Sequence, residues 1–301
     1  MVSFKTNTHP LVVDLDGTLI RTDILVESAS QFLIQHPFQF FKPLLWLMRG
    51  KMVLKTELAY RLHLDVTALP YNADLLDWLR AEKLTGRRLV LATASHRVLA
   101  EQVAQHLNLF DEVLATEGDT NLKSTAKAQA LIDRFGEGGF DYVGNDWPDR
   151  QVWAKAHTAH VVDAPTSLLS CAQAQGNVGR IFNSTMPSMF VAMLKAMRLH
   201  QWMKNLLVFV PLMAAHQYAD AQRDVLALMA FVIFSLTASS VYLLNDLVDV
   251  QDDRHHARKR HRPFASGALS LVLGWCTWPL LLLLAIGLSA AFMPVDRKSV
   301  V

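Results

Sequence analysis

The distribution of apolar and polar positions divides the chain into two parts. Up to about Asn183, short apolar runs are mixed with charged residues, as in a water-soluble domain. Beyond it lie long blocks without charge, 225–245 and 264–295, each longer than the roughly 20 residues that cross a bilayer as a helix. A shorter block, 205–219, is long enough only if its amphipathic approach, 197–202, is counted. The pattern predicts up to three membrane helices, at about 203–220, 224–246 and 267–293.

A chain of 301 residues has room for two domains. We predict a soluble domain over residues 1–172, a linker over 173–187 that is rich in Gly, Asn, Ser and Thr, and a membrane domain over 188–301. The two cysteines, Cys171 and Cys276, lie far apart in different domains. They therefore give no indication of a disulfide framework or of a cysteine zinc site.

Charge predicts how the chain is oriented in the membrane. The N-terminus lacks the apolar core of a signal peptide, so we expect the soluble domain to stay in the cytoplasm. One crossing out and one back then place the loop after the second apolar block in the cytoplasm. That loop has the positive charge that cytoplasmic loops carry, in Arg254, Arg258, Lys259, Arg260 and Arg262. We predict a multi-pass protein of the inner (plasma) membrane, and no nucleic-acid partner.

The first candidate site follows the apolar run Leu11–Val13, which is typical of a buried strand. The next five residues are Asp-Leu-Asp-Gly-Thr, and Gly17 allows a tight turn there. Active sites of parallel α/β sheets lie at such strand ends. Asp14 can attack a phosphorus atom and become an aspartyl phosphate, while Asp16 can protonate the leaving oxygen and later activate water. Asp and Gly are also common turn residues, but the full pattern after an apolar strand is rarer.

This arrangement resembles the haloacid dehalogenase phosphatase superfamily, and later segments follow that family's order. A second predicted strand ends at Thr93, which matches the hydroxyl that holds the phosphoryl group, with Ser95 as a nearby alternative. The family's phosphate-neutralising lysine falls on Lys123, with Lys127, one helical turn along, as the less favoured alternative. A third strand is expected over Phe140–Gly144.

The resemblance also implies a Mg²⁺ site. Asp14 and Asp16 would hold the ion together with the segment after the third strand, where the family usually shows Gly-Asp-x-x-x-Asp. Here Asn145 occupies the place of the first aspartate of that pattern. An amide oxygen can still bind Mg²⁺ but removes a negative charge, which Asp146 and Asp149 are close enough to compensate.

The fold implied is α/β, with a Rossmann-like parallel sheet and a helical cap at about residues 20–86, as in phosphoserine-phosphatase-like members of the superfamily. Within the cap, the segment Phe38–Met48 is unusually apolar. Such a segment can form the core of the cap. It can also form a surface that rests on the bilayer or guides a lipid-linked substrate. The sequence leaves both interpretations open.

The second candidate site lies at the end of the second apolar block. Asp246, Asp249 and Asp253 are spaced by three and four residues, so their carboxylates share one face of a helix. Carboxylates at the end of a membrane helix are costly unless they bind cations, and Mg²⁺ ions bridging a diphosphate would offset that cost. The alternative is an ordinary acidic helix end that faces water.

This cluster resembles the first aspartate-rich motif of the UbiA-type intramembrane prenyltransferases. The segment Gln201–Asn205 is most similar to the branch that transfers phosphoribose from phosphoribosyl pyrophosphate to decaprenyl phosphate. The resemblance implies Mg²⁺ ligands at Asn245, Asp246, Asp249 and Asp253. It also implies four cations that hold phosphate oxygens, although each can equally be a positive-inside anchor: Arg198, Lys204, Lys259 and Arg262.

We therefore predict an all-α membrane domain that is a truncated UbiA-like bundle, because members of that superfamily have further helices and a second aspartate motif. The expected function is bifunctional: a Mg²⁺-dependent phosphomonoester hydrolase fused to a transferase of prenyl or phosphoribosyl groups. The alternative is a catalytically weak first domain that regulates or anchors the transferase. The expected partners are a phosphorylated small molecule or lipid-linked sugar phosphate, a polyprenyl (di)phosphate and the lipid bilayer.

Overall fold

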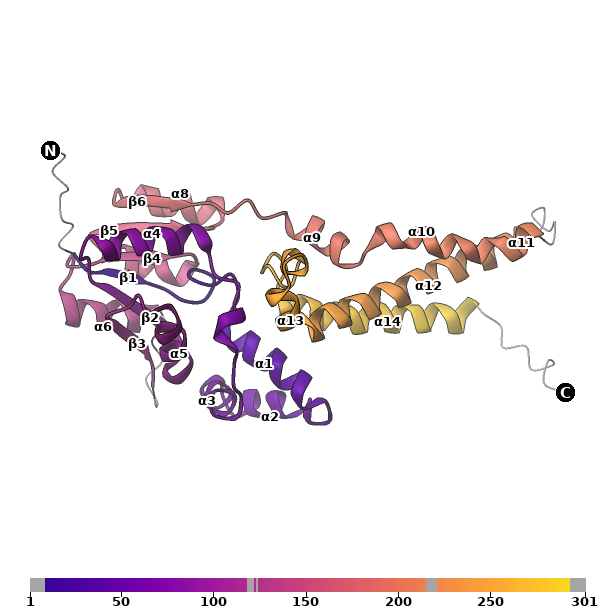
Figure 1. The fold of residues 1–301 in the computed structure, drawn as a ribbon, viewed down its shortest axis with the longest axis horizontal. Coiled ribbons are helices and arrows are strands. Elements are labelled where there is room, and N and C mark those ends of the chain that lie inside the picture. The colour runs from indigo at the N-terminus through magenta and orange to yellow at the C-terminus, as the bar shows by residue number, and fades with distance from the viewer. Residues whose placement is uncertain (1–8, 118–121, 123, 215–220, 293–301) are drawn as a thin grey trace. The chain divides into compact units, whose positions relative to one another are not determined.

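A computed structural model describes residues 9–117, 122, 124–214 and 221–292 (Figure 1). The chain folds into two compact units, Met1–Met186 and Pro187–Val301. The first is an α/β unit built on a parallel sheet, and the second is all-helical, as predicted.

The sheet of the first unit has six parallel strands in the order β3-β2-β1-β4-β5-β6. Val13 of β1 pairs with Leu91 of β2 on one side and with Val143 of β4 on the other. The loops that follow these three strands therefore meet at one edge of the sheet, where ligands bind in folds of this kind. The strands are β1 (Leu11–Val13), β2 (Leu89–His96), β3 (Glu112–Thr116), β4 (Asp141–Gly144), β5 (Thr158–Val162) and β6 (Val178–Phe182).

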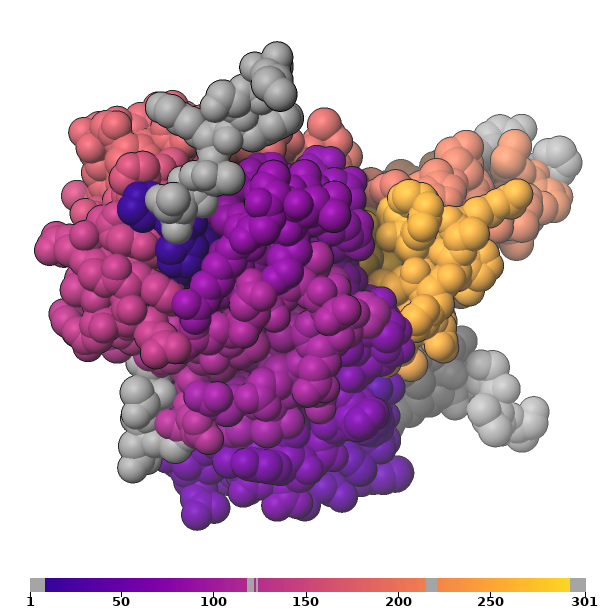
Figure 2. Space-filling view, turned by 60° about the vertical axis from the view of Figure 1, so that its left-hand side comes forward, coloured from indigo at the N-terminus to yellow at the C-terminus, as the bar shows by residue number. Residues whose placement is uncertain are grey.

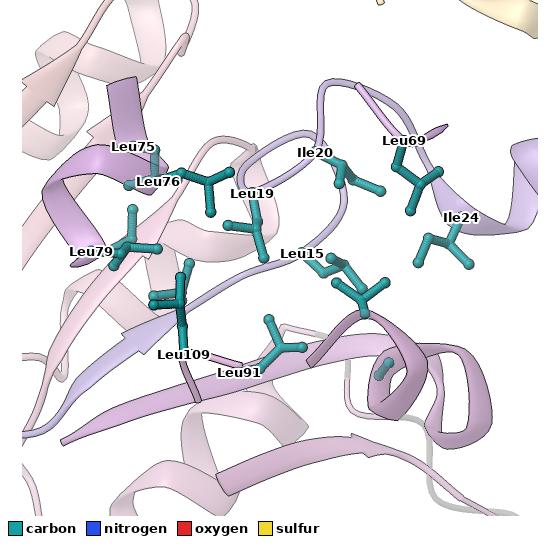
Figure 3. Packing of buried hydrophobic residues seen from close by; sticks show 14 of the residues in the cluster. Leu15, Leu19, Ile20, Ile24, Leu69, Leu75, Leu76, Leu79, Leu91 and Leu109 are labelled. Atoms are coloured by element: carbon teal, nitrogen blue, oxygen red, sulfur yellow. The ribbon is translucent and has the colours of Figure 1, made fainter. Parts of the chain in front are cut away.

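Alternation of side chains along the strands produces two apolar layers. Leu11 and Val13 join one buried cluster, whereas Val12 joins the other. Helices α4 (Ala73–Leu84) and α5 (Arg97–Leu107) contribute to the first cluster, where Leu19 lies beside Leu76 (Figure 3). The second cluster is completed by α6 (Thr125–Phe135), α7 (Arg150–Trp153) and α8 (Thr166–Ala174).

The cap is shorter than predicted. It has its own small core of Phe32, Trp46, Leu54, Leu58 and Leu62. The predicted range of about 20–86 was too long, because α4 packs on the sheet and not in the cap. A segment with one short helix, η2 (Val66–Ala68), connects the cap to α4. The cap consists of α1 (Ile24–Gln35), η1 (Pro37–Gln39), α2 (Lys42–Met48) and α3 (Lys51–Arg61).

The first unit extends beyond its predicted end at residue 172, whereas the division between the units, after Met186, falls at the end of the predicted linker. The expected linker 173–187 contains β6, which pairs with β5 in the sheet. Its polar composition was misleading, because β6 is an edge strand whose Gly179 and Arg180 are exposed. The connection is residues 183–188. Every member of the three buried clusters of the first unit lies between Leu11 and Phe182, so residues 1–186 have the core of an independent domain.

Two helices of the second unit are long and apolar enough to cross a membrane, counting the described residues only: α12 (Ala221–Val248) and α14 (Leu271–Phe292). The third predicted span, 203–220, is a series of short helices up to Ala214, and its end lies outside the described residues. Pro211 lacks the N–H that would continue a helix at that point. The remaining elements are α9 (Met189–Ala196), η4 (Leu199–Gln201), α10 (Trp202–Asn205), η5 (Leu206–Phe209), α11 (Val210–Ala214), α13 (Val250–His255) and η6 (Lys259–His261).

Small and polar residues mediate the packing of these helices, as is typical of membrane domains. Ser240 Oγ of α12 donates a hydrogen bond to the carbonyl of Trp278 in α14 at 2.8 Å. A Cβ added at Gly274 would lie 2.6 Å from the ring of Phe264, so only glycine allows that contact. The amide of Asn205 donates to Ser235 Oγ at 2.9 Å, which connects α10 to α12.

A buried histidine predicts acid sensitivity of the first unit. His160 Nδ1 accepts the backbone N–H of Arg180 at 2.9 Å, and its ring contacts Trp78 edge-on. Burial lowers the pKa of His160 to about 4, whereas the unfolded chain retains a value of about 6.5. Between these two pH values the unfolded state binds a proton that the folded state excludes. Stability is thus complete above about pH 6.5, and the free energy of unfolding falls by about 3 kcal/mol as the pH drops to about 4.

Urea unfolding of residues 1–186 across that pH range measures this loss, with His160→Gln as the comparison. The variant is expected to lose stability less steeply between pH 6.5 and 4, because other titrating groups are common to both proteins. Parallel curves would show that His160 is not the sensitive group.

Candidate functional site

The two catalytic candidates lie directly after β1. Asp14 is buried, and Gly17 adopts a φ of 75° in the turn that follows. A Cβ at Gly17 would lie 2.3 Å from Asn145 Nδ2, so glycine is required both for backbone conformation and for space. Thr18 Oγ1 donates to Asn145 Oδ1 at 3.1 Å, which ties the loop after β1 to the loop after β4.

A lysine neutralises the first aspartate. Lys127 Nζ, from α6, donates to Asp14 Oδ1 at 2.7 Å and to the hydroxyl of Tyr142 at 3.0 Å. All three side chains are buried. Burial raises the pKa of Asp14 to about 7, and the carboxylate of Asp149 adds to this effect, although Lys127 opposes it. Burial lowers the pKa of Lys127, but the carboxylates of Asp14 and Asp149 outweigh it, so the pKa is raised overall and the ammonium stays charged.

The structure brings Lys127, the less favoured alternative, to the candidate site. Lys123 lies outside the described residues, so its predicted role stays a prediction. Lys127 is placed on the buried face of α6, together with Ala128 and Leu131. The hydrophobic pattern of that helix could have favoured it, since Lys127 stands among apolar positions that face the sheet.

Asp16 connects the sheet to the cap. Its Oδ2 accepts Ser95 Oγ at 2.6 Å and Thr93 Oγ1 at 3.3 Å, and its Oδ1 accepts the backbone N–H of Ile24, the first residue of α1, at 2.8 Å. Burial raises the pKa of Asp16 to about 6, with a further contribution from Asp23, and these hydrogen bonds oppose the rise. The carboxyl group can therefore exchange a proton near neutral pH.

Of the two hydroxyls considered, Ser95 is the one that lines the cavity. Thr93 is fully buried, and its Oγ1 accepts the backbone N–H of Ser95 at 3.0 Å. Thr93 thus shapes the end of β2, and Ser95 presents the accessible hydroxyl. The resemblance favoured Thr93 because this residue was predicted to end the strand. The sequence does not reveal the bulge after Ala92, which decides which of the two hydroxyls faces the cavity.

A cavity of about 320 Å³ lies between the sheet edge and the cap. The cap contributes Lys55, which sequence analysis missed because it belongs to no motif. Lys55 is buried, and its Nζ donates to the carbonyl of Ala94 at 2.5 Å. The cavity therefore has cationic groups from α3 of the cap and from α6, and carboxylates from the loops after β1 and β4. The residues around it are Asp14, Asp16, Asp23, Leu25, Lys51, Lys55, Ala94, Ser95, Ser124, Lys127, Asn145, Asp146, Pro148 and Asp149.

The loop after β4 is organised by Asp149. Its Oδ2 accepts the backbone N–H groups of Asn145 at 2.9 Å and Asp146 at 3.1 Å, and its Oδ1 accepts the hydroxyl of Tyr142 at 2.8 Å. Asp146 is exposed, and its side chain accepts the N–H of Trp147 at 2.7 Å. Asp149 therefore fixes the position of Asn145, which faces Gly17 and Thr18.

The oxygens at this edge fit a hard cation. Asp14 and Asp16 are desolvated carboxylates with raised pKa values, and a cation would favour their charged forms. Asn145 supplies an amide oxygen of the kind that Mg²⁺ accepts. No three His, Cys, Asp or Glu side chains group as a metal cluster within the described ranges, so the amide would have to complete the donor set.

In the second unit, arginines hold two of the predicted metal ligands. Asp246 Oδ1 accepts Arg198 at 2.7 Å and Arg262 at 3.1 Å, and Arg262 also reaches Asp253 Oδ2 at 2.7 Å. Lys259 lies 3.7 Å from Asp253. Asp246 and Asp253 are buried, but Asp249, predicted to share their face, is exposed, because α12 ends before it and α13 begins after it. These contacts bring together three of the four predicted phosphate-binding cations.

Other predicted residues stand apart from this ion-pair cluster. Asn245 and Asp249 are exposed, and Asp249 lies at the junction where α12 ends and α13 begins. Lys204 Nζ donates to Gln201 at 3.5 Å. The segment 201–205 instead makes helix contacts, since Trp202 Nε1 donates to Ser239 Oγ at 3.0 Å. Its role in the structure is packing, which the sequence motif did not reveal.

Comparisons with known families match both units. The profile of the haloacid dehalogenase-like hydrolases matches residues 11–134, and that of the UbiA prenyltransferase family matches residues 205–295. An uncharacterized protein of Sinorhizobium fredii, y4nM, is 34% identical over 284 residues, which cover 94% of this chain and 54% of that protein. The chain thus spans about half the length of this relative.

Other similarities concern one unit each. A decaprenyl-phosphate phosphoribosyltransferase of Corynebacterium glutamicum is 43% identical over 106 residues, 35% of this chain and 31% of that protein. A phosphoserine phosphatase solved with bound substrate is similar with a TM-score of 0.41 and 12% identity, over 59% of this chain and 94% of that one.

Binding of Mg²⁺ to the first unit is expected to depend on pH. Asp14 must be ionised to bind the ion, and its pKa is about 7, so affinity should rise as the pH increases through this value. Thermal shift of residues 1–186 during Mg²⁺ titration measures the affinity. We expect binding at about pH 8 to be at least tenfold tighter than at about pH 5.5.

Asn145→Asp is expected to tighten Mg²⁺ binding further, because it restores a charge beside Asp14. The exposed variant Asp74→Asn, on α4, is the matched control and should leave binding unchanged. A Mg²⁺ affinity that is independent of pH, or unaffected by Asn145→Asp, would contradict this description of the site.

Proposed function

Since this chain joins a haloacid dehalogenase-like hydrolase domain to a domain of the UbiA prenyltransferase family, we propose that it is a bifunctional membrane enzyme. The first unit would hydrolyse a phosphate monoester. The second would belong to a transferase that moves a prenyl or phosphoribosyl group to or from a polyprenyl phosphate. The observation that carries the hydrolase proposal is the cluster of Asp14, Asp16, Ser95 and Lys127 around one cavity.

The carboxylate of Asp14 is the nucleophile in this proposal. Its oxygen forms a bond to phosphorus while the bond from phosphorus to the ester oxygen breaks. Asp16, with its pKa raised to about 6, donates a proton to the departing alkoxide. In the second half, Asp16 accepts a proton from water as the water oxygen attacks the aspartyl phosphate. Inorganic phosphate leaves and Asp14 is regenerated.

Two donors on this chain suit the phosphoryl oxygens. Lys127 already lies beside Asp14, so it can compensate charge on both the nucleophile and the phosphoryl group. Ser95 lines the cavity and can turn its hydroxyl from Asp16 to the ligand. When bound, Mg²⁺ would supply charge neutralisation for the phosphate and the carboxylates. Asp14 and Asn145 would hold it with their side chains, because Asp16 needs its proton for the leaving oxygen; Asp146 lines the same cavity.

The cap supports a small anionic substrate. Lys51 and Lys55 line the cavity from α3. These lysines can bind a second negative group of the substrate, away from the phosphate that reacts. A phosphorylated sugar or a lipid-linked sugar phosphate is consistent with this charge distribution, and in the phosphoribosyl version the transferase product retains such a phosphate.

The ion-pair cluster supports the transferase half of the proposal. Arg198, Arg262 and Lys259 already lie at Asp246 and Asp253, so a Mg²⁺-bound diphosphate would find both cationic and anionic ligands there. Arg262 contacts both aspartates. With a diphosphate present, Arg262 would bind phosphate oxygens instead, and the two carboxylates would hold Mg²⁺. The similarity to decaprenyl-phosphate phosphoribosyltransferases favours a phosphoribosyl donor.

A second candidate function is favoured by Asn145. If the amide leaves the Mg²⁺ site too weak for turnover, the first unit is a binding module that regulates or anchors the transferase. Activity of Asn145→Asp separates the two: a large gain from a near-inactive parent supports the module, and a modest change in an active parent supports the enzyme.

Phosphatase activity of residues 1–186 with Mg²⁺ and p-nitrophenyl phosphate tests the hydrolase proposal. Asp14→Asn is expected to reduce kcat at least about a thousandfold, because the amide cannot form the covalent intermediate. Lys127→Met should reduce kcat/KM about a hundredfold or more by leaving the phosphoryl charge uncompensated.

Lys123→Met is the matched control for the second variant, since it removes the other candidate lysine. Activity that survives Asp14→Asn would refute the nucleophile assignment. A larger loss with Lys123→Met than with Lys127→Met would return the phosphate-binding role to the residue favoured by the family match.

Binding of Mg²⁺ and inorganic pyrophosphate to the full chain in detergent tests the second site. Titration calorimetry should show binding beyond that of residues 1–186 alone. We expect Arg262→Gln to weaken this additional binding at least tenfold, since its guanidinium contacts both aspartates. Lys204→Gln should have little effect, because that side chain lies at Gln201. Equal effects of the two variants would contradict the site.

A further inference from the structure

The cap carries large apolar side chains that are exposed and do not belong to its core. Phe38 is 91% exposed, Met48 78%, Phe40 67% and Leu44 60%. Trp46 is the one residue of α2 that is buried in the cap core. Three more large apolar side chains complete the set that we call the cap surface: Phe41, Leu45 and Leu47.

The cap surface is concentrated on one short segment. It runs from η1 into α2, and α2 lies on the side of the cap away from the sheet (Figure 1). The cap is part of the molecular surface in the space-filling view as well (Figure 2). Contiguous apolar side chains at this exposure are unusual on a soluble domain and mark an interaction site. Of Phe38–Met48, Trp46 belongs to the cap core, and most of the other large apolar side chains form a surface.

Charge around the cap surface restricts the partner. The sequence contains no Asp or Glu between Glu27 and Glu57, whereas it contains Lys42, Arg49 and Lys51 beside the apolar positions. Lys51 and Arg49 are exposed. Exposed aromatic and aliphatic side chains flanked by cations and without acidic neighbours fit the interface of an anionic bilayer, where apolar groups enter the headgroup boundary and cations contact lipid phosphates.

The rest of the chain keeps a bilayer available to this surface. Helices α12 and α14 are long and apolar enough to cross a membrane. The first unit is joined to them through residues 183–188, which extend about 20 Å at most. The connection thus keeps the first unit close to the membrane that these helices would cross. A second copy of the chain, in contrast, would have to reach the cap surface by diffusion.

We propose that the cap surface, Phe38–Met48 with Lys42 and Arg49, docks the first unit on an anionic lipid bilayer. The inserted side chains would be Phe38, Phe40, Leu44 and Met48. The cavity lies between the cap and the sheet edge, and α3 of the same cap carries Lys51 and Lys55 to it, so docking would hold the cavity on the far side of the cap from the lipid. The proposal is independent of the phosphatase chemistry and holds for a catalytically weak domain as well.

Sedimentation of residues 1–186 with vesicles tests the proposal, because this segment contains its complete core. Vesicles of phosphatidylcholine with phosphatidylglycerol should bind the wild-type domain, and phosphatidylcholine alone should bind it less. The combined variant Phe38→Ser, Phe40→Ser, Leu44→Ser and Met48→Ser should lower the partition coefficient at least about tenfold. Lys42→Gln with Arg49→Gln should weaken binding to the anionic vesicles alone.

Leu84→Ser is the matched control, since Leu84 is 89% exposed but lies on α4, outside the cap surface. It should bind vesicles as the wild type does. Retained turnover of p-nitrophenyl phosphate, or a retained melting temperature if the domain is inactive, shows that the serine variant is folded. Hydrogen exchange provides a measurement without mutation, and backbone amides of 38–48 should become protected when vesicles are added.

Equal sedimentation of the serine variant and the wild type would overturn the proposal, as would absence of vesicle binding by the wild type. A wild-type dimer in solution that becomes monomeric in the serine variant, without any binding to vesicles, would assign the cap surface to a second copy of the chain instead. Loss of phosphatase activity in Asp14→Asn leaves vesicle binding intact, so the two proposals fail separately.

Discussion

The ion pair between the Asp14 carboxylate and the Lys127 ammonium holds the first unit's site together, because three elements meet there. Asp14 follows β1, Lys127 comes from α6, and Tyr142 of β4 contacts the same lysine. A carboxylate in this position is costly to bury, and one lysine does not offset that cost fully. The raised pKa of Asp14 shows this. Because part of the cost of burying the Asp14 carboxylate remains, the cavity is suited to a metal ion and a phosphate.

The second unit meets the same constraint in a different way. Asp246, near the end of α12, and Asp253, in α13, are buried, and Arg198 and Arg262 neutralise them directly. Guanidinium groups form several directed bonds at once, so one arginine can hold both aspartates. Both units thus place carboxylates beside exchangeable cationic partners, an arrangement that suits phosphate and diphosphate ligands, although the two sites share no element of fold.

Much of this could be predicted from the sequence, because the motifs depend on local spacing. The strand–Asp-x-Asp-Gly-Thr pattern placed Asp14 and Asp16 correctly at the sheet edge, and the two long apolar helices followed from composition. What sequence could not supply were contacts between distant segments. Choosing Lys127 or Lys123 depends on how α6 is rotated against the sheet, and Lys55 reaches the cavity only because the cap folds back over it. The linker prediction was wrong because an exposed edge strand resembles a loop in composition.

The hydrogen bond from the Ile24 N–H to Asp16 Oδ1 couples the cap to acid–base chemistry. That bond favours the ionised carboxylate, so moving the start of α1 away would raise the proton affinity of Asp16. Thermodynamic linkage makes the relation reciprocal. Protonating Asp16 must weaken the hold on the first turn of α1, and ionising it must strengthen that hold. Through this bond alone, release of α1 would favour the acid that the first proposed step consumes, whereas hydration of an opened cavity would act the other way, since burial is the main cause of the raised pKa of Asp16.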